Sequence, residues 1–266
     1  MLMISVSALT SYLYCPRKFY MQYALGISEP ARKPTLEGTI LHNTIDRMQV
    51  GINQLTAGVT PQTTLKELEM SYKKIFYTGL FNAINANEAD IKKLGIDKLA
   101  LFKQLWEQLS EDAESKAAFV HALAKANNAY GKELAEKISA STEVRLESQT
   151  LGIRGIVDRI EERGDKTFVY EMKTGSAPRE GIWPNHKIQL AAYMLMLKEQ
   201  GKDVEGVLEY GKDCRKLMLN PFIEEEVTSL IDTVKSALKT PTAPAKADNE
   251  NKCTNCGLKK YCDQMP

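Results

Sequence analysis

A change in hydrophobic period at Ser141 is the feature that most constrains the fold of this chain. Before this point the apolar residues recur at helical spacing, whereas after it β-branched residues gather in short runs separated by polar turn residues. The runs are STEVRLES at 141–148, GIRGIVDRIEER at 152–163 and KTFVYEMK at 166–173. They predict three successive strands. Helical patterns return at about 185–199 and 223–238, with a further predicted strand at 204–210, so we expect an α/β core.

The rest of the chain is predicted to be helical. Residues 5–25 predict two short helices that meet at Cys15-Pro16, because proline interrupts a helix but is accepted in its first turn. Another helix is expected from Gly38 to about Asn53. Residues 62–137 read as helical almost throughout, and we interpret them as a packing and binding surface without a chemical motif. Breaks between helices are expected near Thr78-Gly79, Gly95 and Gly131.

The hairpin predicted at 152–173 places two carboxylates together. If Gly164-Asp165 is a two-residue turn, then paired residues sum to 329 and Asp158 lies opposite Glu171. Lys173 is two residues from Glu171 and points to the same side. Phe168, Tyr170 and Met172 are then expected to face apolar packing on the other side.

An Asp, a Glu and a Lys that converge on a sheet have a chemical use. Carboxylate oxygens bind Mg²⁺ or Mn²⁺, such an ion activates a water at a phosphodiester, and an ammonium steadies the developing charge. The alternative is an exposed cross-strand salt pair, which is the commoner meaning of such a grouping. His42, in EGTILHNTIDRM, is either a packing residue or an imidazole ligand that favours Mn²⁺. Gln189 and Tyr193 lie one helical turn apart on one face.

Three of the five cysteines lie at the end of the chain. Cys253, Cys256 and Cys262 have the spacing C-x2-C-x5-C, one thiolate short of the four that a structural zinc site or a cubane iron-sulfur cluster takes. Residues 240–251 are rich in Pro, Ala and Asn and are predicted to be a tether that delivers these cysteines. The cysteine content argues for metal or catalytic use over a disulfide framework.

Composition excludes several classes of protein. The 35 Lys and Arg residues balance 34 Asp and Glu residues, so the net charge of +1 gives no global basic field, and a polyanion would have to bind in a local groove. No apolar run is long enough to span a membrane, and the first residues do not resemble a secretion signal. We therefore expect a cytoplasmic protein without membrane contacts.

Taken in order, His42, GIVD ending at Asp158, EMK at 171–173 and QLAAY at 189–193 resemble the RecB-type branch of the PD-(D/E)XK nucleases. Cys15, in YLYCPRKFY, together with the three terminal cysteines resembles the iron-sulfur members of this branch. The CRISPR-associated RecB-like exonucleases, the fourth protein family of CRISPR adaptation, are the most similar group. The resemblance implies a restriction-endonuclease-like core, in which helices flank a mixed sheet, with a helical insertion and a C-terminal cluster segment.

The resemblance also implies roles for individual residues. The expected metal ligands are His42, Asp158, Glu171 and the carbonyl of Met172, the catalytic lysine is Lys173, and Gln189 and Tyr193 support the site and the DNA strand. A 4Fe-4S cluster would be bound by Cys15, Cys253, Cys256 and Cys262, with zinc as the alternative. Cys214 is left as an ordinary buried or strand-end thiol. The basic residues near the cluster are either solvated surface or phosphate contacts: Arg17, Lys18, Lys259 and Lys260.

The implied function is a Mn²⁺- or Mg²⁺-dependent exonuclease that acts on single-stranded DNA ends in the 5′–3′ direction and processes prespacer DNA with CRISPR integrase proteins. Two alternatives stay open: a nuclease of recombination and repair, and a DNA-end recognition module without catalysis. The residues themselves do not reveal cleavage polarity, sequence preference or oligomeric state. We expect one nuclease domain over 1–266, composed of N-terminal helices at 1–54, the insertion at 55–137, the core at 138–240 and the cluster segment at 241–266.

Overall fold

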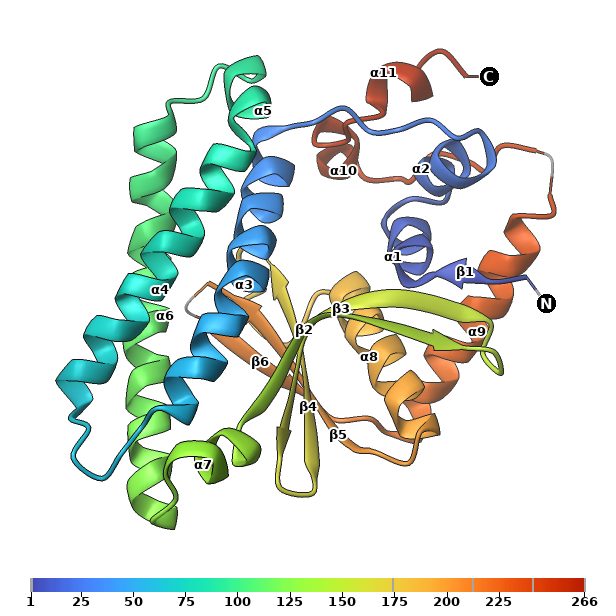
Figure 1. The fold of residues 1–266 in the computed structure, drawn as a ribbon. Helices are drawn as coiled ribbons and strands as arrows, with labels where there is room; N and C mark the ends of the chain where they lie inside the picture. The colour runs from blue at the N-terminus through green and yellow to red at the C-terminus, as the bar shows by residue number, and fades with distance from the viewer. Residues whose placement is uncertain (1, 174, 212, 241, 266) are drawn as a thin grey trace. The chain divides into compact units, whose positions relative to one another are not determined.

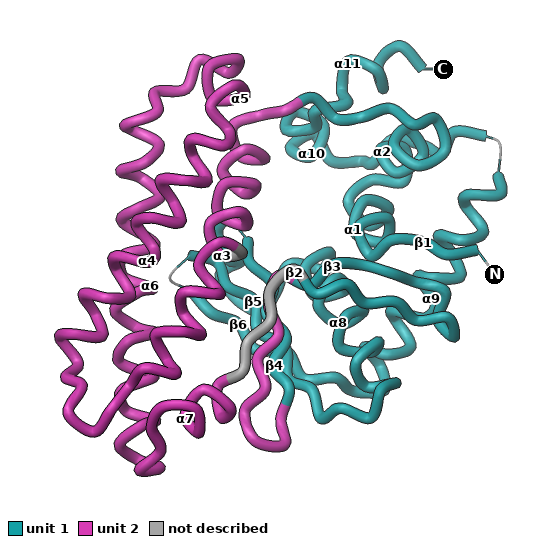
Figure 2. The backbone as a smooth tube through the Cα atoms, viewed as in Figure 1, with its two compact units in different colours: residues 1–30, 144–157, 167–266 teal, residues 31–143, 158–166 magenta. Residues whose placement is uncertain are grey.

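The computed structural model describes residues 2–173, 175–211, 213–240 and 242–265. The chain forms two compact units, which Figure 2 distinguishes by colour. The first comprises residues 1–30, 144–157 and 167–266, and the second comprises residues 31–143 and 158–166. The predicted division into one domain with four segments stays a prediction.

The second unit is built mainly from helices, as the sequence predicts. Its helices are α3 (Lys33–Ala57), α4 (Leu65–Ala86), α5 (Glu88–Lys93), α6 (Lys98–Asn127) and α7 (Gly131–Lys137). The three long ones, α3, α4 and α6, run alongside one another in Figure 1, with α4 in contact with both of the others. A capping box starts α4, because Thr64 accepts from the backbone N–H of Glu67 while the Glu67 carboxylate accepts from Thr64 N–H.

The predicted break at Thr78-Gly79 is wrong, because both residues lie inside α4. The glycine reflects close packing between helices. A Cβ at position 79 would lie 2.7 Å from Cγ of Met48 and 3.3 Å from the carbonyl oxygen of Thr44, both on α3. Gly95 and Gly131 do mark helix boundaries as predicted, and both have positive φ angles, of 63° and 61°.

The first unit begins with a short strand and the two predicted helices. Strand β1 (Ile4–Ser5) leads into α1 (Val6–Tyr14), whose N-cap Ser5 accepts from the N–H of Ala8. Cys15 has an extended backbone between α1 and α2 (Pro16–Phe19), and a π-helical turn, η1 (Tyr20–Ala24), follows. The meeting of two helices at Cys15-Pro16 is therefore confirmed.

A six-stranded mixed sheet is the centre of the α/β core. The strands after β1 are β2 (Ser139–Ser148), β3 (Ile153–Arg163), β4 (Lys166–Lys173), β5 (Asp203–Tyr210) and β6 (Asp213–Leu217). Their order is β1-β3-β4-β5-β6, and β2 also pairs with β3. The β1–β3 pair is parallel and the β5–β6 pair is antiparallel. The predicted fold class, a mixed sheet with flanking helices, is confirmed, whereas β1 and β6 were not predicted.

Two further helices of the first unit pack together next to this sheet. Helix α8 (Pro184–Glu199) contacts β5, α1 and α9 (Pro221–Ala237), and every residue from Leu190 to Leu197 in α8 is buried. The approach to the sheet is close, because a Cβ at Gly206 of β5 would lie 2.6 Å from Sδ of Met194. Burial on all sides holds α8 in a fixed position against β5.

The chain ends in two short helices. The predicted tether at 240–251 includes Pro241, which lies outside the described residues, and residues 242–249 have neither helix nor strand. Helices α10 (Glu250–Thr254) and α11 (Lys259–Cys262) follow. In Figure 1 both lie beside α2 at the other end of the chain.

Candidate active site

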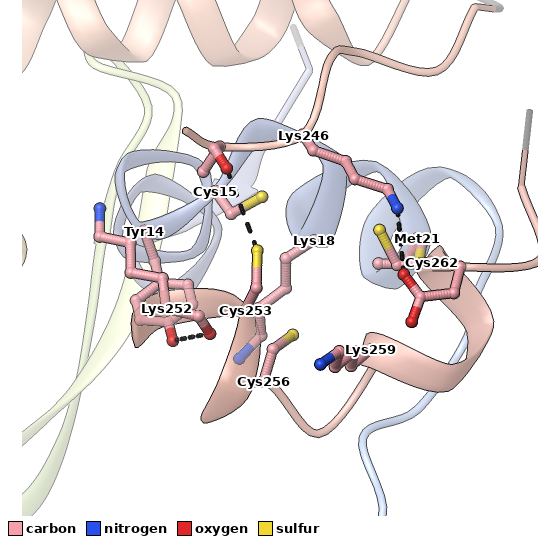
Figure 3. Close-up of a pocket in the computed structure, with 12 residues that line it drawn as sticks. Tyr14, Cys15, Lys18, Met21, Lys246, Lys252, Cys253, Cys256, Lys259 and Cys262 are labelled. Carbon is pink, nitrogen blue, oxygen red and sulfur yellow. Dashed lines mark hydrogen bonds and ion pairs between the residues drawn. The ribbon is translucent and has the colours of Figure 1, made fainter. Parts of the chain in front are cut away.

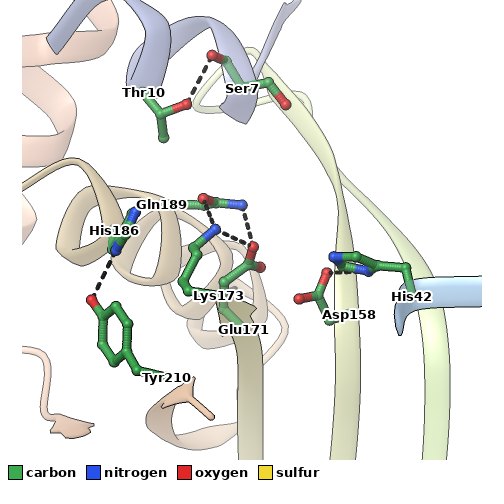
Figure 4. Close-up of polar contacts among 9 residues, drawn as sticks. All are labelled: Ser7, Thr10, His42, Asp158, Glu171, Lys173, His186, Gln189 and Tyr210. Carbon is green, nitrogen blue, oxygen red and sulfur yellow. Dashed lines mark hydrogen bonds and ion pairs between the residues drawn. The ribbon is translucent and has the colours of Figure 1, made fainter. Parts of the chain in front are cut away.

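Glu171, Lys173 and Gln189 form a closed set of hydrogen bonds in the first unit (Figure 4). The Lys173 ammonium donates to Oε1 of Glu171 at 2.8 Å and to Oε1 of Gln189 at 2.7 Å. The Gln189 amide in turn donates from Nε2 to Oε1 of Glu171 at 2.6 Å. Strand β4 and helix α8 therefore bring together three residues that the sequence predicts for one site.

Burial makes this arrangement costly unless its charges are compensated. Glu171 is 3% exposed, and burying a carboxylate without hydrogen-bond partners would destabilise the fold by more than about 1–3 kcal/mol. The ammonium of Lys173 and the amide of Gln189 provide the compensation. A solvated salt pair, the alternative interpretation, does not fit a carboxylate at this depth.

The faces of β4 differ from the prediction in one respect. One face of β4 is more deeply buried than the other. It carries Thr167, Val169 and Glu171, which are 1%, 0% and 3% exposed. Phe168 and Met172, which were expected to face apolar packing, are only half-buried, although Tyr170 is buried. The hydrophobic pattern misled here because the site's carboxylate lies on the covered side of the strand.

His42 and Asp158 are neighbours in the second unit. Nδ1 of His42, on α3, lies 3.3 Å from Oδ1 of Asp158, on β3 (Figure 4). The imidazole is about one third exposed, and the carboxylate is 10% exposed. An imidazole and a carboxylate oxygen at this separation are ligand types that Mn²⁺ accepts.

The predicted hairpin has the expected connection. Strand β3 ends at Arg163 and β4 begins at Lys166, so Gly164-Asp165 is a two-residue turn, with a φ of 61° at the glycine. The two strands are neighbours in the sheet. The register that pairs Asp158 with Glu171 is consistent with these strand ends and stays a prediction.

Tyr193 is a buried residue of α8, at 2% exposed. A Cβ at Gly155 of β3 would lie 2.6 Å from Cε1 of Tyr193, so the ring occupies the space that the glycine leaves open. The predicted contact of Tyr193 with a DNA strand and the predicted use of the Met172 carbonyl stay predictions.

Sequence reasoning missed two residues beside this site. His186 lies three residues before Gln189 on α8, and its Nδ1 is 2.8 Å from the hydroxyl of Tyr210 at the end of β5. Burial, and then the charge of Lys173, lowers the pKa of His186 to about 4. The available signal was the helical spacing, because 186, 189 and 193 fall on one side of a helix.

A second cluster of candidate ligands lies in a pocket of the first unit (Figure 3). The pocket has a volume of about 160 Å³, and its lining includes all four predicted cysteines: Cys15, Cys253, Cys256 and Cys262. The two ends of the chain thus supply sulfur atoms to one cavity. Cys214, in contrast, is exposed on β6, so it is a strand thiol and not a buried one.

Hydrogen bonds hold the ends of the chain together around this pocket. The Tyr14 hydroxyl donates to the carbonyl oxygen of Lys252 at 2.9 Å, and Gly257 N–H donates to Oε1 of Glu29 at 3.1 Å. Nε of Arg17 donates to the carbonyl oxygen of Pro244 at 2.8 Å. Arg17 is 8% exposed, so it ties the tether to α2 and does not match the solvated prediction, whereas its contact with phosphate stays a prediction.

The three lysines predicted beside the cluster have different surroundings. Lys18 pairs with Glu29 at 2.7 Å and lies 5.0 Å from the ring centroid of Tyr14. Lys259 and Lys260 are both exposed on α11, and Lys259 also lines the pocket. Their role toward phosphate stays a prediction.

The donors present in the pocket suit a soft metal centre. Four thiols are the number that a closed zinc site or a cubane iron-sulfur cluster takes, so the donor set fits either group. Among the residues that the structure describes, no group of three or more His, Cys, Asp or Glu side chains is arranged to hold a single metal ion.

The mixed sheet and the Glu-x-Lys strand define a class of protein. The chain matches the PD-(D/E)XK nuclease superfamily over residues 3–263 and belongs to that superfamily. Two relatives carry the name CRISPR-associated exonuclease Cas4/endonuclease Cas1 fusion. The one from Leptospira interrogans serogroup Icterohaemorrhagiae serovar Lai (strain 56601) is 33% identical over 124 residues, which is 43% of this chain and 23% of that protein.

The fusion protein of Myxococcus xanthus (strain DK1622) is 27% identical over 128 residues, covering 45% of this chain and 22% of the relative. The CRISPR-associated exonuclease Cas4 of Francisella tularensis subsp. novicida (strain U112) is 26% identical over 172 residues, 60% of this chain and 80% of that protein. The chain thus spans less than a quarter of the two fusion proteins. These matches confirm the resemblance to CRISPR-associated RecB-like nucleases. Within the described ranges, no helix is long and apolar enough to cross a membrane.

Proposed function

We propose that this protein is a metal-dependent DNA exonuclease that acts on single-stranded ends in the 5′–3′ direction and processes prespacer DNA in CRISPR adaptation. Membership of the PD-(D/E)XK superfamily supports nuclease chemistry. The names of the relatives, CRISPR-associated exonucleases, support the exonuclease activity and the pathway.

The observation that carries the proposal is the closed hydrogen-bond set of Glu171, Lys173 and Gln189. A sheet position with a purely structural role would be filled by apolar residues. Burying two opposite charges and an amide stabilises a fold little, because the desolvation penalty often exceeds the Coulombic gain. A preorganised carboxylate and ammonium at one point are what phosphodiester hydrolysis requires.

The residues proposed to hold Mn²⁺ or Mg²⁺ are His42, Asp158, Glu171 and the carbonyl of Met172. Carboxylate oxygens suit both ions, and the imidazole favours Mn²⁺. When bound, the ion supplies an activated water and neutralises charge on the scissile phosphate.

The remaining side chains position the substrate. Lys173 carries a positive charge that would bind a phosphate oxygen and stabilise the negative charge that develops there. Gln189 orients both Lys173 and Glu171, because its amide donates to one and its carbonyl oxygen accepts from the other. Tyr193 is buried one turn further along α8, and its ring packs over Gly155 of β3. This packing fixes the position of Gln189 and its helix against the strand.

For the cysteine pocket we propose a 4Fe-4S cluster bound by Cys15, Cys253, Cys256 and Cys262. The support is that four thiols from the two ends of the chain line one cavity. A cluster there would join the chain ends and add its binding free energy to folding.

We also propose an integrase of the CRISPR adaptation machinery as a partner. Two relatives are named as fusions of the exonuclease Cas4 with the endonuclease Cas1. Proteins that are fused in one organism commonly act together as separate chains in another. Prespacer ends trimmed by the nuclease would then pass to the integrase.

Incubation of end-labelled DNA with the purified protein tests the nuclease proposal. Single- and double-stranded oligonucleotides labelled at the 5′ or the 3′ end are mixed with protein and Mn²⁺, Mg²⁺ or a chelator. We expect progressive shortening of single strands from the 5′ end with either ion and none with chelator. Wild-type protein that is inert in all conditions would overturn the enzyme, and shortening from the 3′ end would overturn the polarity alone.

A further inference from the structure

The contact between His186 and Tyr210 lies beside the candidate active site and has no role in the proposal above. His186 begins the same side of α8 that carries Gln189, and Tyr210 ends β5, the strand next to β4. In Figure 4 a dashed line joins the imidazole to the phenol oxygen, and the Lys173–Gln189 pair lies on the other side of the imidazole. The charge of Lys173 reaches the ring, since it contributes to lowering the pKa of His186 after burial does.

The hydroxyl of Tyr210 is the hydrogen-bond partner of one ring nitrogen of His186, so the direction of this bond and the tautomer of the ring are linked. Burial raises the pKa of Tyr210, so the phenol keeps its proton. When the hydroxyl donates this proton to Nδ1 of His186, 2.8 Å away, Nδ1 is the acceptor nitrogen of the ring. Because a neutral imidazole has one donor and one acceptor nitrogen, Nε2 carries the hydrogen.

The surroundings keep the ring neutral. Lys173 on β4 is the charged group that acts on it, and Tyr210 on β5 is uncharged. The charges of Asp213 and Arg215 on β6 act on the pKa of Tyr210 in opposite directions, because Asp213 raises it and Arg215 lowers it. His186 also lies in the first turn of α8, where the positive end of the helix disfavours an added cation. A neutral N–H beside a fixed ammonium is a pair of donors suited to a phosphate group.

We infer that His186 is a further substrate-contacting residue, which donates its Nε2–H to a phosphate oxygen of DNA beside Lys173, and that Tyr210 is a positioning residue that fixes this tautomer. The inference rests on the proposed nuclease function and adds a donor to its phosphate site.

Three variants separate this role from simple packing between α8 and β5. His186→Leu removes both nitrogens, His186→Gln keeps an N–H donor at about the distance of Nε2, and Tyr210→Phe removes only the hydroxyl. His121→Leu, at a half-buried histidine of α6, is the matched control. The measurements are kcat and KM on single-stranded DNA with Mn²⁺, and the melting temperature in chelator.

We expect His186→Leu to lower kcat/KM roughly ten- to a hundredfold, as for loss of a hydrogen bond to a charged group. His186→Gln should recover most of the loss, and Tyr210→Phe should fall between them, with melting temperatures close to wild type. Equal activity of the Leu and Gln variants would contradict the inference. So would activity that falls only in step with the melting temperature.

A binding measurement keeps the inference testable even if cleavage is absent. The chain has three histidines, so ¹⁵N-histidine spectra of the whole protein are simple to assign with the His186→Gln variant. In chelator, wild type should show an Nε2-protonated ring at His186, and its signal should shift when a 5′-phosphorylated oligo(dT) is added. An Nδ1-protonated ring, or an unchanged signal with DNA bound, would overturn the role of His186. Absence of cleavage together with a shifted signal would instead overturn the nuclease activity and leave the phosphate contact standing.

Discussion

Gln189 donates to the same oxygen of Glu171 that accepts from Lys173. Oε1 of the carboxylate receives Nε2 of Gln189 at 2.6 Å and Nζ of Lys173 at 2.8 Å, while Oε1 of Gln189 accepts from Lys173 at 2.7 Å. The amide can satisfy both neighbours in one orientation only, because one needs a donor and the other an acceptor. Gln189 therefore sets the positions of the carboxylate and the ammonium at once.

Replacing Gln189 by Leu should lower kcat without unfolding the protein. The side chain is of similar size, but both hydrogen bonds to the site are lost, so we expect kcat to fall roughly ten- to a hundredfold. Single-turnover cleavage of labelled DNA measures the effect. Gln104→Leu, at an exposed glutamine of α6, is the control, and a Gln189→Leu enzyme as fast as that control would contradict the assigned role.

The cysteine pocket predicts a coloured protein. Protein purified without oxygen should be brown, with broad absorbance at about 400 nm and bound iron and sulfide, as thiolate-ligated clusters have. Cys15→Ala, Cys253→Ala, Cys256→Ala and Cys262→Ala should each lose the colour and much of their solubility, because the cluster would join the chain ends. Cys214→Ala should keep both, since Cys214 is an exposed residue of β6. Colourless wild type with one bound zinc would contradict the cluster and leave the nuclease claim untouched.

Gly79 should be intolerant of a side chain. An added Cβ would lie 2.7 Å from Cγ of the buried Met48, so Gly79→Ala should destabilise the protein by about 1–3 kcal/mol, although alanine favours helices. Gly51→Ala in α3 is the matched control, because its Cβ would meet the side chain of Ile75 at ordinary contact distances, with Cγ2 nearest at 3.4 Å. That variant should be neutral or up to about 1 kcal/mol more stable. Urea unfolding of the two variants compares them, and equal stabilities would show that α3 and α4 are not packed so closely.

His186 should make the protein sensitive to mild acid. Burial and the charge of Lys173 lower its pKa to about 4, whereas an unfolded histidine takes up a proton near pH 6.5. Between these values the unfolded state binds the extra proton, so stability falls as the pH falls through this window. His186→Gln removes this contribution. From about pH 7 to about pH 5, wild type should lose about 1 kcal/mol more than the variant, after allowance for partial exposure of the ring. Equal losses in urea unfolding would contradict the depressed pKa.

Local sequence signals predicted the elements that carry chemistry. Pro16 marks the junction of α1 and α2 because it cannot lie in a helix interior, and Gly164-Asp165 marks the β3–β4 turn because the glycine needs a positive φ. These signals depend on one or two residues. Tertiary contacts therefore do not change what these signals indicate. The predictions about Cys15, Glu171 and Lys173 depended on them.

The missed features depend on partners that are distant in sequence. Strand β1 has two residues, and it exists because Ile4 and Ser5 pair with Ile153 and Arg154. Strand β6, with the sequence DCRKL, is too polar to predict alone and forms by pairing with β5. Gly79 resembles a helix break in sequence, and only the approach of Met48 explains it. His186 could not be recognised as a candidate site residue from the sequence, because its partner Tyr210 lies 24 residues away on β5.

The most direct test of the central claim is the cleavage rate of Glu171→Gln on 5′-labelled single-stranded DNA with Mn²⁺, measured beside wild type and Glu147→Ala, an exposed carboxylate of β2. Glutamine keeps the volume of the buried side chain but removes the charge that would bind the ion, so the protein should fold and cleave at least about 10³-fold more slowly. Glu147→Ala should cleave like wild type. A folded Glu171→Gln protein that degrades DNA at the wild-type rate would contradict the assignment of this site as the nuclease centre.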